Sequence, residues 1–281
     1  MKRPNSYLIL GSLLFQILLF LYLDQVVFAP AVSFTQRAVL NEEEVQIISS
    51  PDNTSFARLT DGIFKIYNHE VGYVGKYIIP NEGKVTYFEY YPERNLAVAG
   101  IVQIKNGATT VICQEINTQN SQVTQWKLNG LVKGATIVES AYLGEQSVLH
   151  ILLREGTSTY LYRTATEELQ RVKTNTTQIN RIATLQKQGL LFFDNNNRGA
   201  IYYLTSKGEV KQLVTPKGSY ALIGIDQEDR IYLGQLSDKK KITTVVAGNL
   251  DGAFVQVSKF VKPLELSALR ISVEGELLIS P

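Results

Sequence analysis

The sequence predicts an all-β fold built from repeated four-stranded units, and three observations support this prediction. After residue 31, no segment of about 12 residues or more carries apolar side chains at the spacing of an amphipathic helix. Short runs rich in β-branched and apolar residues recur instead, separated by turn residues. These runs repeat about every 43 residues, the period of one blade in a β-propeller. We therefore expect a β-propeller; a β-sandwich or barrel is the alternative, since it also has regularly spaced short strands.

An apolar segment precedes this body. Residues 7–23 contain no charged side chain, and Lys2 and Arg3 lie before them. As a helix they measure roughly 26 Å, and extension to Ala29 gives roughly 34 Å, against about 30 Å for a hydrocarbon core. We expect residues 1–31 to form an uncleaved signal anchor in the cell membrane. The N-terminus would then lie on the cytoplasmic side, and the remaining chain outside the cell membrane. The alternative is a signal peptide cleaved near Ala29-Pro30-Ala31, which leaves a secreted or periplasmic protein.

Residues 32–281 form the second predicted domain, in which strands group into repeated meanders. Turn residues such as Lys105-Asn106-Gly107 and Glu155-Gly156 divide the strands. The predicted meanders are residues 96–103, 109–116 and 122–128; 148–154, 159–164 and 169–173; 190–194, 200–205 and 209–214; and 230–235, 242–247 and 254–257. The innermost strand of each unit precedes its meander, at residues 85–90, 136–140, 179–184, 219–225 and 266–273.

The number of blades follows from the same spacing. The outer strands end about 42 to 49 residues apart, at Ile79, Leu128, Val172, Val214 and Val257. Five units fill residues 45–257, and residues 266–279 supply two strands of a sixth. Since propellers commonly close by pairing strands from both termini, residues 32–40 could complete that unit as its outermost strand. We expect about six blades; five or seven remain open because degenerate strands are easily missed.

One segment carries a resemblance to known repeats. Residues 198–213, with the sequence RGAIYYLTSKGEVKQL, resemble two outer strands and the turn of a blade in the NHL-like and pyrroloquinoline-quinone-like repeat proteins. These are bacterial propellers with degenerate repeats, and the resemblance covers about residues 45–281. The resemblance implies a β-propeller fold. The chain lacks the Gly-His and Trp-Asp pairs of WD repeats, and Trp126 is its only tryptophan, so no quinone cofactor is inferred and none of another class is expected.

Composition excludes several kinds of site. The chain has 28 basic and 26 acidic residues, a balance that does not favour nucleic-acid binding. Cys113 is the only cysteine, so neither an internal disulfide nor a cysteine-based zinc site can form. The two histidines, His69 and His150, lie about two blades apart, and no Gly-x-Ser-x-Gly motif marks a nucleophile. We expect His150 to be a strand residue.

Two groups of residues are candidate ligand contacts. Tyr87, Tyr90 and Tyr91 lie at the end of one inner strand, where some of them could stack on a sugar or peptide; packing in the core is the more ordinary role. Asp194 and Asn195 could supply oxygen ligands to a metal such as calcium, although a hairpin loop is the more ordinary explanation for them. We expect residues 226–229 and 239–241 to form solvated turns.

These observations favour a noncatalytic, membrane-tethered propeller outside the cytoplasm, which binds a protein partner or a cell-envelope polymer. The competing hypothesis is a metal-assisted propeller hydrolase or lyase that acts on a lactone or carbohydrate. The first is preferred because no catalytic constellation stands out in the sequence. Fold alone cannot choose between them, since propellers carry unrelated activities.

Overall fold

The computed structural model describes residues 46–49, 55–60, 63–68, 72–78, 83–91, 94–120, 122–143, 148–165, 168–272 and 274–279. Strands dominate these residues, together with two short 3-10 helices, η3 (Gln186–Gln188) and η4 (Leu266–Ala268). None of the helices in the described ranges is long and apolar enough to span a bilayer. The predicted anchor at residues 1–31, the predicted strand at residues 32–40 and His69 lie outside the described residues.

Antiparallel sheets follow one another along the chain, and each is a meander in chain order. Sheets 1 to 5 have four strands, and sheet 6 has two within the described residues. Sheet 1 contains β1 (Gln46–Ser49), β2 (Ser55–Thr60), β3 (Ile63–Asn68) and β4 (Gly72–Ile78); sheet 2 contains β5 (Lys84–Tyr91), β6 (Leu96–Lys105), β7 (Ala108–Asn117) and β8 (Val123–Leu131); sheet 3 contains β9 (Thr136–Leu143), β10 (Val148–Glu155), β11 (Ser158–Thr164) and β12 (Leu169–Arg171).

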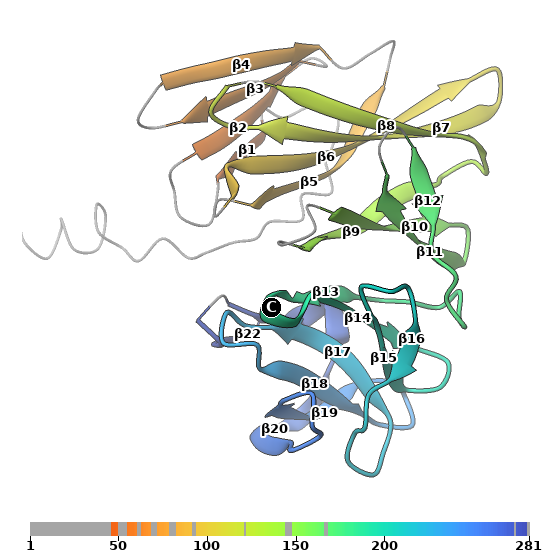
Figure 1. Cartoon of the computed structure of the whole chain (residues 1–281), viewed down its shortest axis with the longest axis vertical. Helices are drawn as coiled ribbons and strands as arrows, with labels where there is room; N and C mark the ends of the chain where they lie inside the picture. The colour runs from red at the N-terminus through yellow and green to blue at the C-terminus, as the bar shows by residue number, and fades with distance from the viewer. Residues whose placement is uncertain are drawn as a thin grey trace, which may run out of the picture.

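The second half of the chain repeats this pattern. Sheet 4 contains β13 (Ile182–Leu185), β14 (Leu190–Asn195), β15 (Ala200–Leu204) and β16 (Val210–Gln212); sheet 5 contains β17 (Tyr220–Ile225), β18 (Ile231–Leu236), β19 (Ile242–Gly248) and β20 (Val255–Leu264); sheet 6 contains β21 (Leu269–Ile271) and β22 (Leu277–Ile279). Figure 1 shows the sheets arranged around a common centre, with β5, β9, β13 and β17 towards it. The predicted four-stranded unit and its five full copies are confirmed.

Sheets 2 to 5 each bury both faces against the neighbouring sheets. Adjacent residues of β14 show how: Phe192 packs in the hydrophobic cluster between sheets 4 and 5, whereas Phe193 packs in the cluster between sheets 3 and 4. Side chains alternate across a strand, so one apolar pair serves two interfaces. Each ring also stacks on a tyrosine of β15, Phe192 on Tyr203 at 5.4 Å and Phe193 on Tyr202 at 5.7 Å. Comparable clusters join sheets 1 and 2, 2 and 3, and 5 and 6.

A five-residue turn recurs in sheets 4 to 6. The side-chain oxygen of its first residue accepts a hydrogen bond from the N–H of its fifth residue, at 2.9 to 3.2 Å. Its fourth residue has positive φ, which favours glycine or a residue that tolerates left-handed backbone. The turns are residues 205–209, 226–230, 237–241 and 272–276. The predicted turns at residues 226–229 and 239–241 are therefore present.

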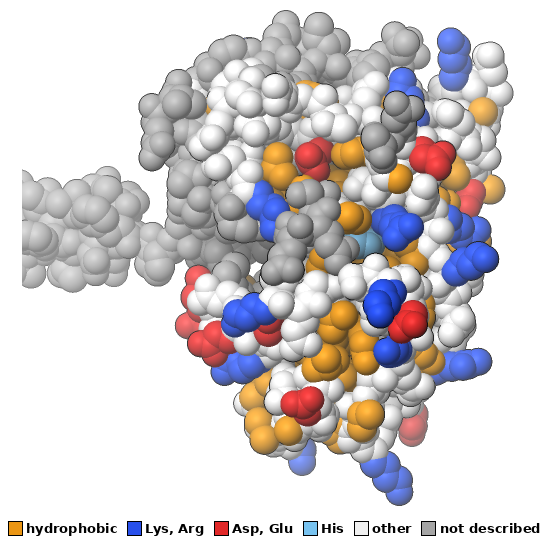
Figure 2. Space-filling model, viewed as in Figure 1, with side chains coloured by type: hydrophobic (Ala, Val, Ile, Leu, Met, Phe, Trp, Pro, Cys, Tyr) orange, Lys and Arg blue, Asp and Glu red, His pale blue; other side chains and the backbone are white. Residues whose placement is uncertain are grey.

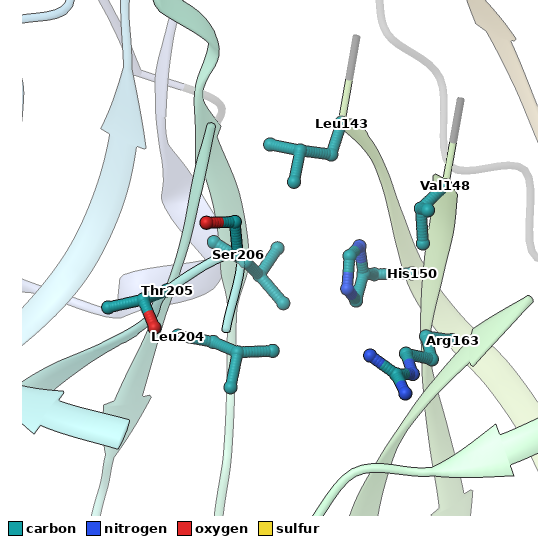
Figure 3. A pocket seen from close by; sticks show the side chains of 8 residues that line it. Leu143, Val148, His150, Arg163, Leu204, Thr205 and Ser206 are labelled. Atoms are coloured by element: carbon teal, nitrogen blue, oxygen red, sulfur yellow. The ribbon is translucent and has the colours of Figure 1, made fainter. Parts of the chain in front are cut away.

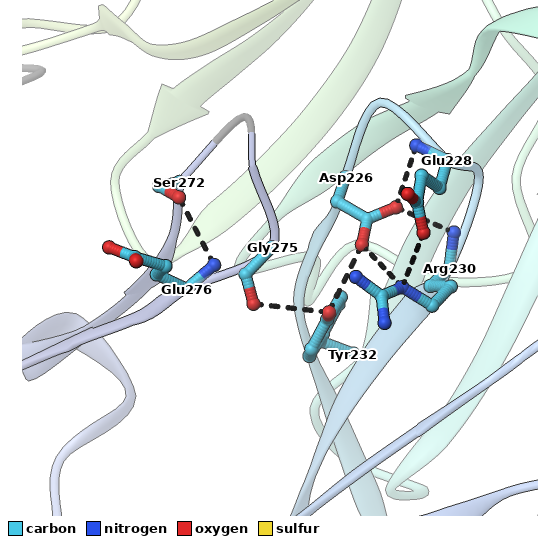
Figure 4. Close-up of polar contacts among 7 residues, drawn as sticks. All are labelled: Asp226, Glu228, Arg230, Tyr232, Ser272, Gly275 and Glu276. Carbon is cyan, nitrogen blue, oxygen red and sulfur yellow. Dashed lines mark hydrogen bonds and ion pairs between the residues drawn. The ribbon is translucent and has the colours of Figure 1, made fainter.

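One of these turns ties sheet 5 to sheet 6. Asp226 is only 5 % exposed rather than solvated as expected, and its Oδ1 accepts the N–H groups of Glu228 and Arg230, both at 2.9 Å. Its Oδ2 lies 2.8 Å from Nε of Arg230 and 3.0 Å from the hydroxyl of Tyr232 (Figure 4). That hydroxyl is also 3.1 Å from the carbonyl oxygen of Gly275, in the turn of sheet 6. The carboxylate therefore holds two turns together.

Candidate functional site

Three buried charged residues, Glu139, Arg181 and Asp194, lie on or beside the inner strands β9 and β13, and we call them the inner-strand cluster. Arg181 immediately precedes β13 and is 8 % exposed. Its guanidinium donates to the carbonyl oxygens of Ile223 at 2.8 Å, Leu266 at 3.0 Å and Leu269 at 2.7 Å. These acceptors belong to β17 and to the start of sheet 6. One side chain thus joins three sheets where their inner strands meet.

The two carboxylates of the cluster bind the backbone beside Arg181. Glu139, on β9, accepts the N–H of Ile182 at 2.8 Å. Oδ1 of Asp194, at the end of β14, accepts the N–H groups of Asn180 at 2.7 Å and Arg181 at 3.1 Å. A buried carboxylate with backbone donors is a strong acceptor, so both residues fix the start of β13 against sheet 3 and within sheet 4.

Asp194 also has the chemistry of a possible acid or base. Burial raises the pKa of its carboxyl to about 6, although the N–H groups of Asn180 and Arg181 oppose this and the charge of Glu139 adds to it. Its Oδ2 is buried and has no hydrogen-bond partner among the described residues. A carboxyl that titrates near neutral pH can take up and release a proton during a reaction. Such a group is a candidate catalytic residue, although structural clusters also shift pKa values.

A second polar group lies between sheets 2 and 3. The hydroxyl of Ser140, on β9, donates to Oε2 of Glu89 at 2.8 Å and lies 2.8 Å from the Tyr87 hydroxyl and 2.7 Å from the Tyr91 hydroxyl. Tyr87 also donates to Glu89. Burial, followed by the charge of Glu89, raises the pKa of Tyr91 well above its ordinary value. The Tyr91 hydroxyl therefore stays protonated, and the group ties β5 to β9.

The structure separates the three tyrosines that were predicted as ligand contacts. Tyr87 is 4 % exposed and packs between sheets 2 and 3, whereas Tyr90 is 6 % exposed and packs between sheets 1 and 2, edge-on to Phe88 at 4.8 Å. The ring of Tyr91 lies 6.0 Å from that of Tyr142. Alternation along β5 accounts for this division. A role for these rings in ligand binding stays a prediction.

The predicted pair Asp194 and Asn195 divides in the same way. Asn195 is 2 % exposed, and its Oδ1 accepts the N–H groups of Asn197 at 3.2 Å and Arg198 at 3.4 Å. It therefore caps its own hairpin turn, as asparagine commonly does. Asp194 joins the inner-strand cluster instead. Glu139 and Arg181 were not predicted as site residues. Each is a single charged residue in a predicted strand whose other residues are apolar or uncharged, and this pattern could have indicated a buried charge.

No protein-family model matches the chain, and no curated protein matches it. Virginiamycin B lyase from Staphylococcus aureus is structurally similar, with a TM-score of 0.50 and 13 % identity over 84 % of this chain and 83 % of that one. The fold is a β-propeller. Porphyromonas gingivalis dipeptidyl peptidase 4 matches with a TM-score of 0.53 and 11 % identity over 79 % of this chain but 40 % of its own. At identities this low, the similarity to these two proteins concerns the fold alone and does not establish an activity for this chain.

Proposed function

We propose that this propeller is a noncatalytic module, tethered to the membrane and facing outside the cytoplasm, that binds a protein partner. The observation that carries the proposal is a set of four exposed valines, which we call the valine strip. Three of them lie on β20, the outermost strand of sheet 5, and Val214 lies just after β16, the outermost strand of sheet 4. Val214 is 73 % exposed, Val255 66 %, Val257 50 % and Val261 106 %. Figure 2 shows hydrophobic side chains at the lower edge of the molecule, where β20 lies in Figure 1.

The open edge of β20 is a second feature of this region that favours binding of a partner. It is the outermost strand of sheet 5 and pairs with β19 on one side; no strand among the described residues pairs with its other side. An open edge offers backbone donors and acceptors to an extended segment of another protein, and exposed apolar side chains add contact area. Lys259 and Lys262 are exposed on the same strand, which favours an acidic partner segment.

The inner-strand cluster supports a binding role in another way. The charged side chains that a propeller enzyme would direct at a substrate are hydrogen-bonded here to backbone groups of neighbouring sheets, as in the Arg181 contacts. They stabilise a rigid scaffold. Membrane attachment rests on residues 7–23, whose apolar composition and basic flank are typical of a signal anchor.

Photo-crosslinking in intact cells tests this proposal. We expect a crosslinker introduced at position 257 of the full-length chain to yield a discrete protein adduct, and the Val255→Lys exchange to reduce that adduct several-fold. Val132→Lys is the matched control, because Val132 is 51 % exposed but lies outside the valine strip. Equal amounts of adduct in Val255→Lys and Val132→Lys would show that the valine strip is not part of the interface. If a cell-envelope polymer binds the wild-type chain and Val255→Lys equally well, the ligand is the polymer and not a protein partner at the valine strip.

The competing function is a metal-assisted hydrolase or lyase that acts on a lactone or carbohydrate. The Asp194 carboxyl, with its pKa near 6 and unpartnered Oδ2, favours it. In the described part of the chain, however, no three His, Cys, Asp or Glu side chains lie close enough together to bind a metal ion. Turnover of lactone substrates that depends on calcium and disappears in Asp194→Asn would establish the enzyme. A thermal midpoint that calcium or chelator leaves unchanged favours the binding module.

A further inference from the structure

A small cavity lies between sheets 3 and 4, apart from the inner-strand cluster. Its volume is about 30 Å³, and the residues that line it are Leu143, Val148, His150, Arg163, Leu191, Leu204, Thr205 and Ser206. Figure 3 shows the side chains of His150 and Arg163 on one side of the cavity, facing Leu204 and Ser206 on the other. A space of this size holds one or two water molecules or a ligand of a few heavy atoms.

His150 and Arg163 lie directly opposite each other in the ladder between β10 and β11. Directly paired residues of an antiparallel ladder project from the same face, so the imidazole and the guanidinium both reach the cavity. Arg163 donates from Nη2 to Oε1 of Gln170 at 3.3 Å, and no carboxylate among the described residues forms an ion pair with it. The guanidinium can therefore bind a further acceptor.

The imidazole of His150 is unusual in its surroundings. The residue is 3 % exposed, and its Nδ1 is buried with no hydrogen-bond partner in the described part of the chain. Most buried polar atoms have a partner, and an exception points to a missing water or ligand. The cavity that the ring lines provides space for such a partner.

The lining defines the chemistry of a ligand. Guanidinium binds a carboxylate through two parallel hydrogen bonds, and the His150 imidazole adds a second group that can form a hydrogen bond. The four leucine and valine side chains of the cavity suit a hydrogen or methyl group, not a second charge. We propose that the cavity binds a small carboxylate of the size of formate or acetate, held by Arg163 and His150.

Binding of an anion changes the protonation of His150. Burial, and secondly the charge of Arg163, lowers the pKa of the imidazole to about 4. Among the described residues, Arg163 is the only charged residue that lines the cavity, and sheet 4 contributes Leu191, Leu204, Thr205 and Ser206. The negative charge of a bound carboxylate opposes both effects, so the imidazole becomes easier to protonate. Affinity for the carboxylate anion therefore increases as the pH falls from about 5 to about 4.

Nuclear magnetic resonance of the ring nitrogens, with the full-length chain in detergent, tests the proposal. We expect sodium acetate to shift the His150 resonances saturably and to raise the midpoint of their titration by about one pH unit, whereas sodium chloride at equal ionic strength does neither. His69, the only other histidine, is the internal reference. Arg163→Gln should weaken acetate binding at least tenfold, and Arg163→Lys should weaken it less.

Arg171→Gln is the matched control, because this arginine belongs to the same sheet but stacks over Tyr160 at 4.0 Å outside the cavity. It should bind acetate as the wild-type chain does. Three results would overturn the proposal: no saturable shift of His150, an equal response to chloride, or unchanged acetate binding in Arg163→Gln. Each readout is made on folded protein with dispersed spectra, so loss of structure is distinguished from loss of binding.

Discussion

The guanidinium of Arg181 donates a hydrogen bond to the carbonyl oxygen of Leu269 at 2.7 Å, and so joins sheet 4 directly to sheet 6. A second bond from the same side chain reaches Ile223 in sheet 5. Sheet 6 has only two strands in the described part of the chain, and such a small sheet has little core of its own. Its position therefore depends on neighbours, and Arg181 is one of the residues that hold it.

Replacing Arg181 with methionine should lower the free energy of unfolding by about 3 kcal/mol, because three carbonyl oxygens lose a charged donor. Urea denaturation of the purified chain measures this loss. Arg171→Met, at an exposed position on β12, should cost less than about 1 kcal/mol. Similar losses for both exchanges would contradict the role assigned to Arg181.

Gly275→Ala should displace the turn of sheet 6. Gly275 has a φ of +86°, and a Cβ there would lie 2.6 Å from Oδ2 of Asp226, 2.7 Å from Nη2 of Arg230 and 2.8 Å from the Tyr232 hydroxyl. We expect a loss of about 2–4 kcal/mol. Gly208, with a φ of +82° in an equivalent turn, has open space at its Cβ, so Gly208→Ala isolates the cost of the backbone, about 1 kcal/mol. Equal losses in the two variants would mean that the contacts of Gly275 do not matter.

Two buried groups should make opposite contributions to the pH dependence of stability. The pKa of His150 is lowered from 6.5 to about 4, so the unfolded chain binds the proton more tightly and stability falls as the pH drops from about 6.5 to 4. The pKa of Asp194 is raised from 3.8 to about 6, so the folded chain binds the proton more tightly and stability increases over nearly the same interval. Each contribution is on the order of 3 kcal/mol, and the two largely cancel.

Variants separate these contributions. As the pH falls from 6.5 to 4, His150→Gln should gain stability relative to the wild-type chain, whereas Asp194→Asn should lose it. Denaturant unfolding at intervals of half a pH unit gives both differences, and subtraction of the wild-type values cancels the other titrating groups. A difference that does not change with pH, in either variant, would show that the corresponding group titrates alike in the folded and unfolded chain.

Closure by residues 32–40 stays a prediction, and disulfide trapping tests it. A cysteine at Leu278 in β22, combined in turn with cysteines at Phe34, Thr35 and Gln36, should form a crosslink in at least one combination if the two segments pair. The background is low because Cys113, the only native cysteine, is fully buried. A cysteine at Ile104, exposed at the end of β6 in sheet 2, serves as the mismatched partner. If the cysteine at Leu278 forms no more crosslink with residues 34–36 than the cysteine at Ile104 does, residues 32–40 do not pair with β22.

The repeated meanders were predictable because their signals are local. Short runs of apolar residues, bounded by turn residues with left-handed backbone, identify strands and hairpins within a few positions, as in β14 and β15. The length of β20 was not predictable in the same way. The sequence predicted only residues 254–257, whereas the strand continues to Leu264. Lys259, Lys262 and Pro263 interrupt the apolar pattern, and an edge strand tolerates them because one side faces solvent.

The candidate site was less predictable than the fold. Asp194 was selected from a polar loop, yet its significance depends on Arg181 and Glu139, which a sequence window does not connect with it. The imidazole of His150 was expected on a strand and does lie on β10, but the cavity beside it exists only because sheet 4 packs there. Interactions between blades join residues far apart in the chain, and local patterns carry no information about them.

The separation between Arg181 and its acceptors has a consequence for synthesis. Leu266 and Leu269 follow Arg181 by 85 and 88 residues. A nascent chain that has already folded its first four blades on the ribosome therefore holds this cation without its acceptors in sheet 6 until residue 269 has emerged. An incompletely translated product would expose both the cation and the uncovered face of the fifth blade, which gives quality control a means to recognise it.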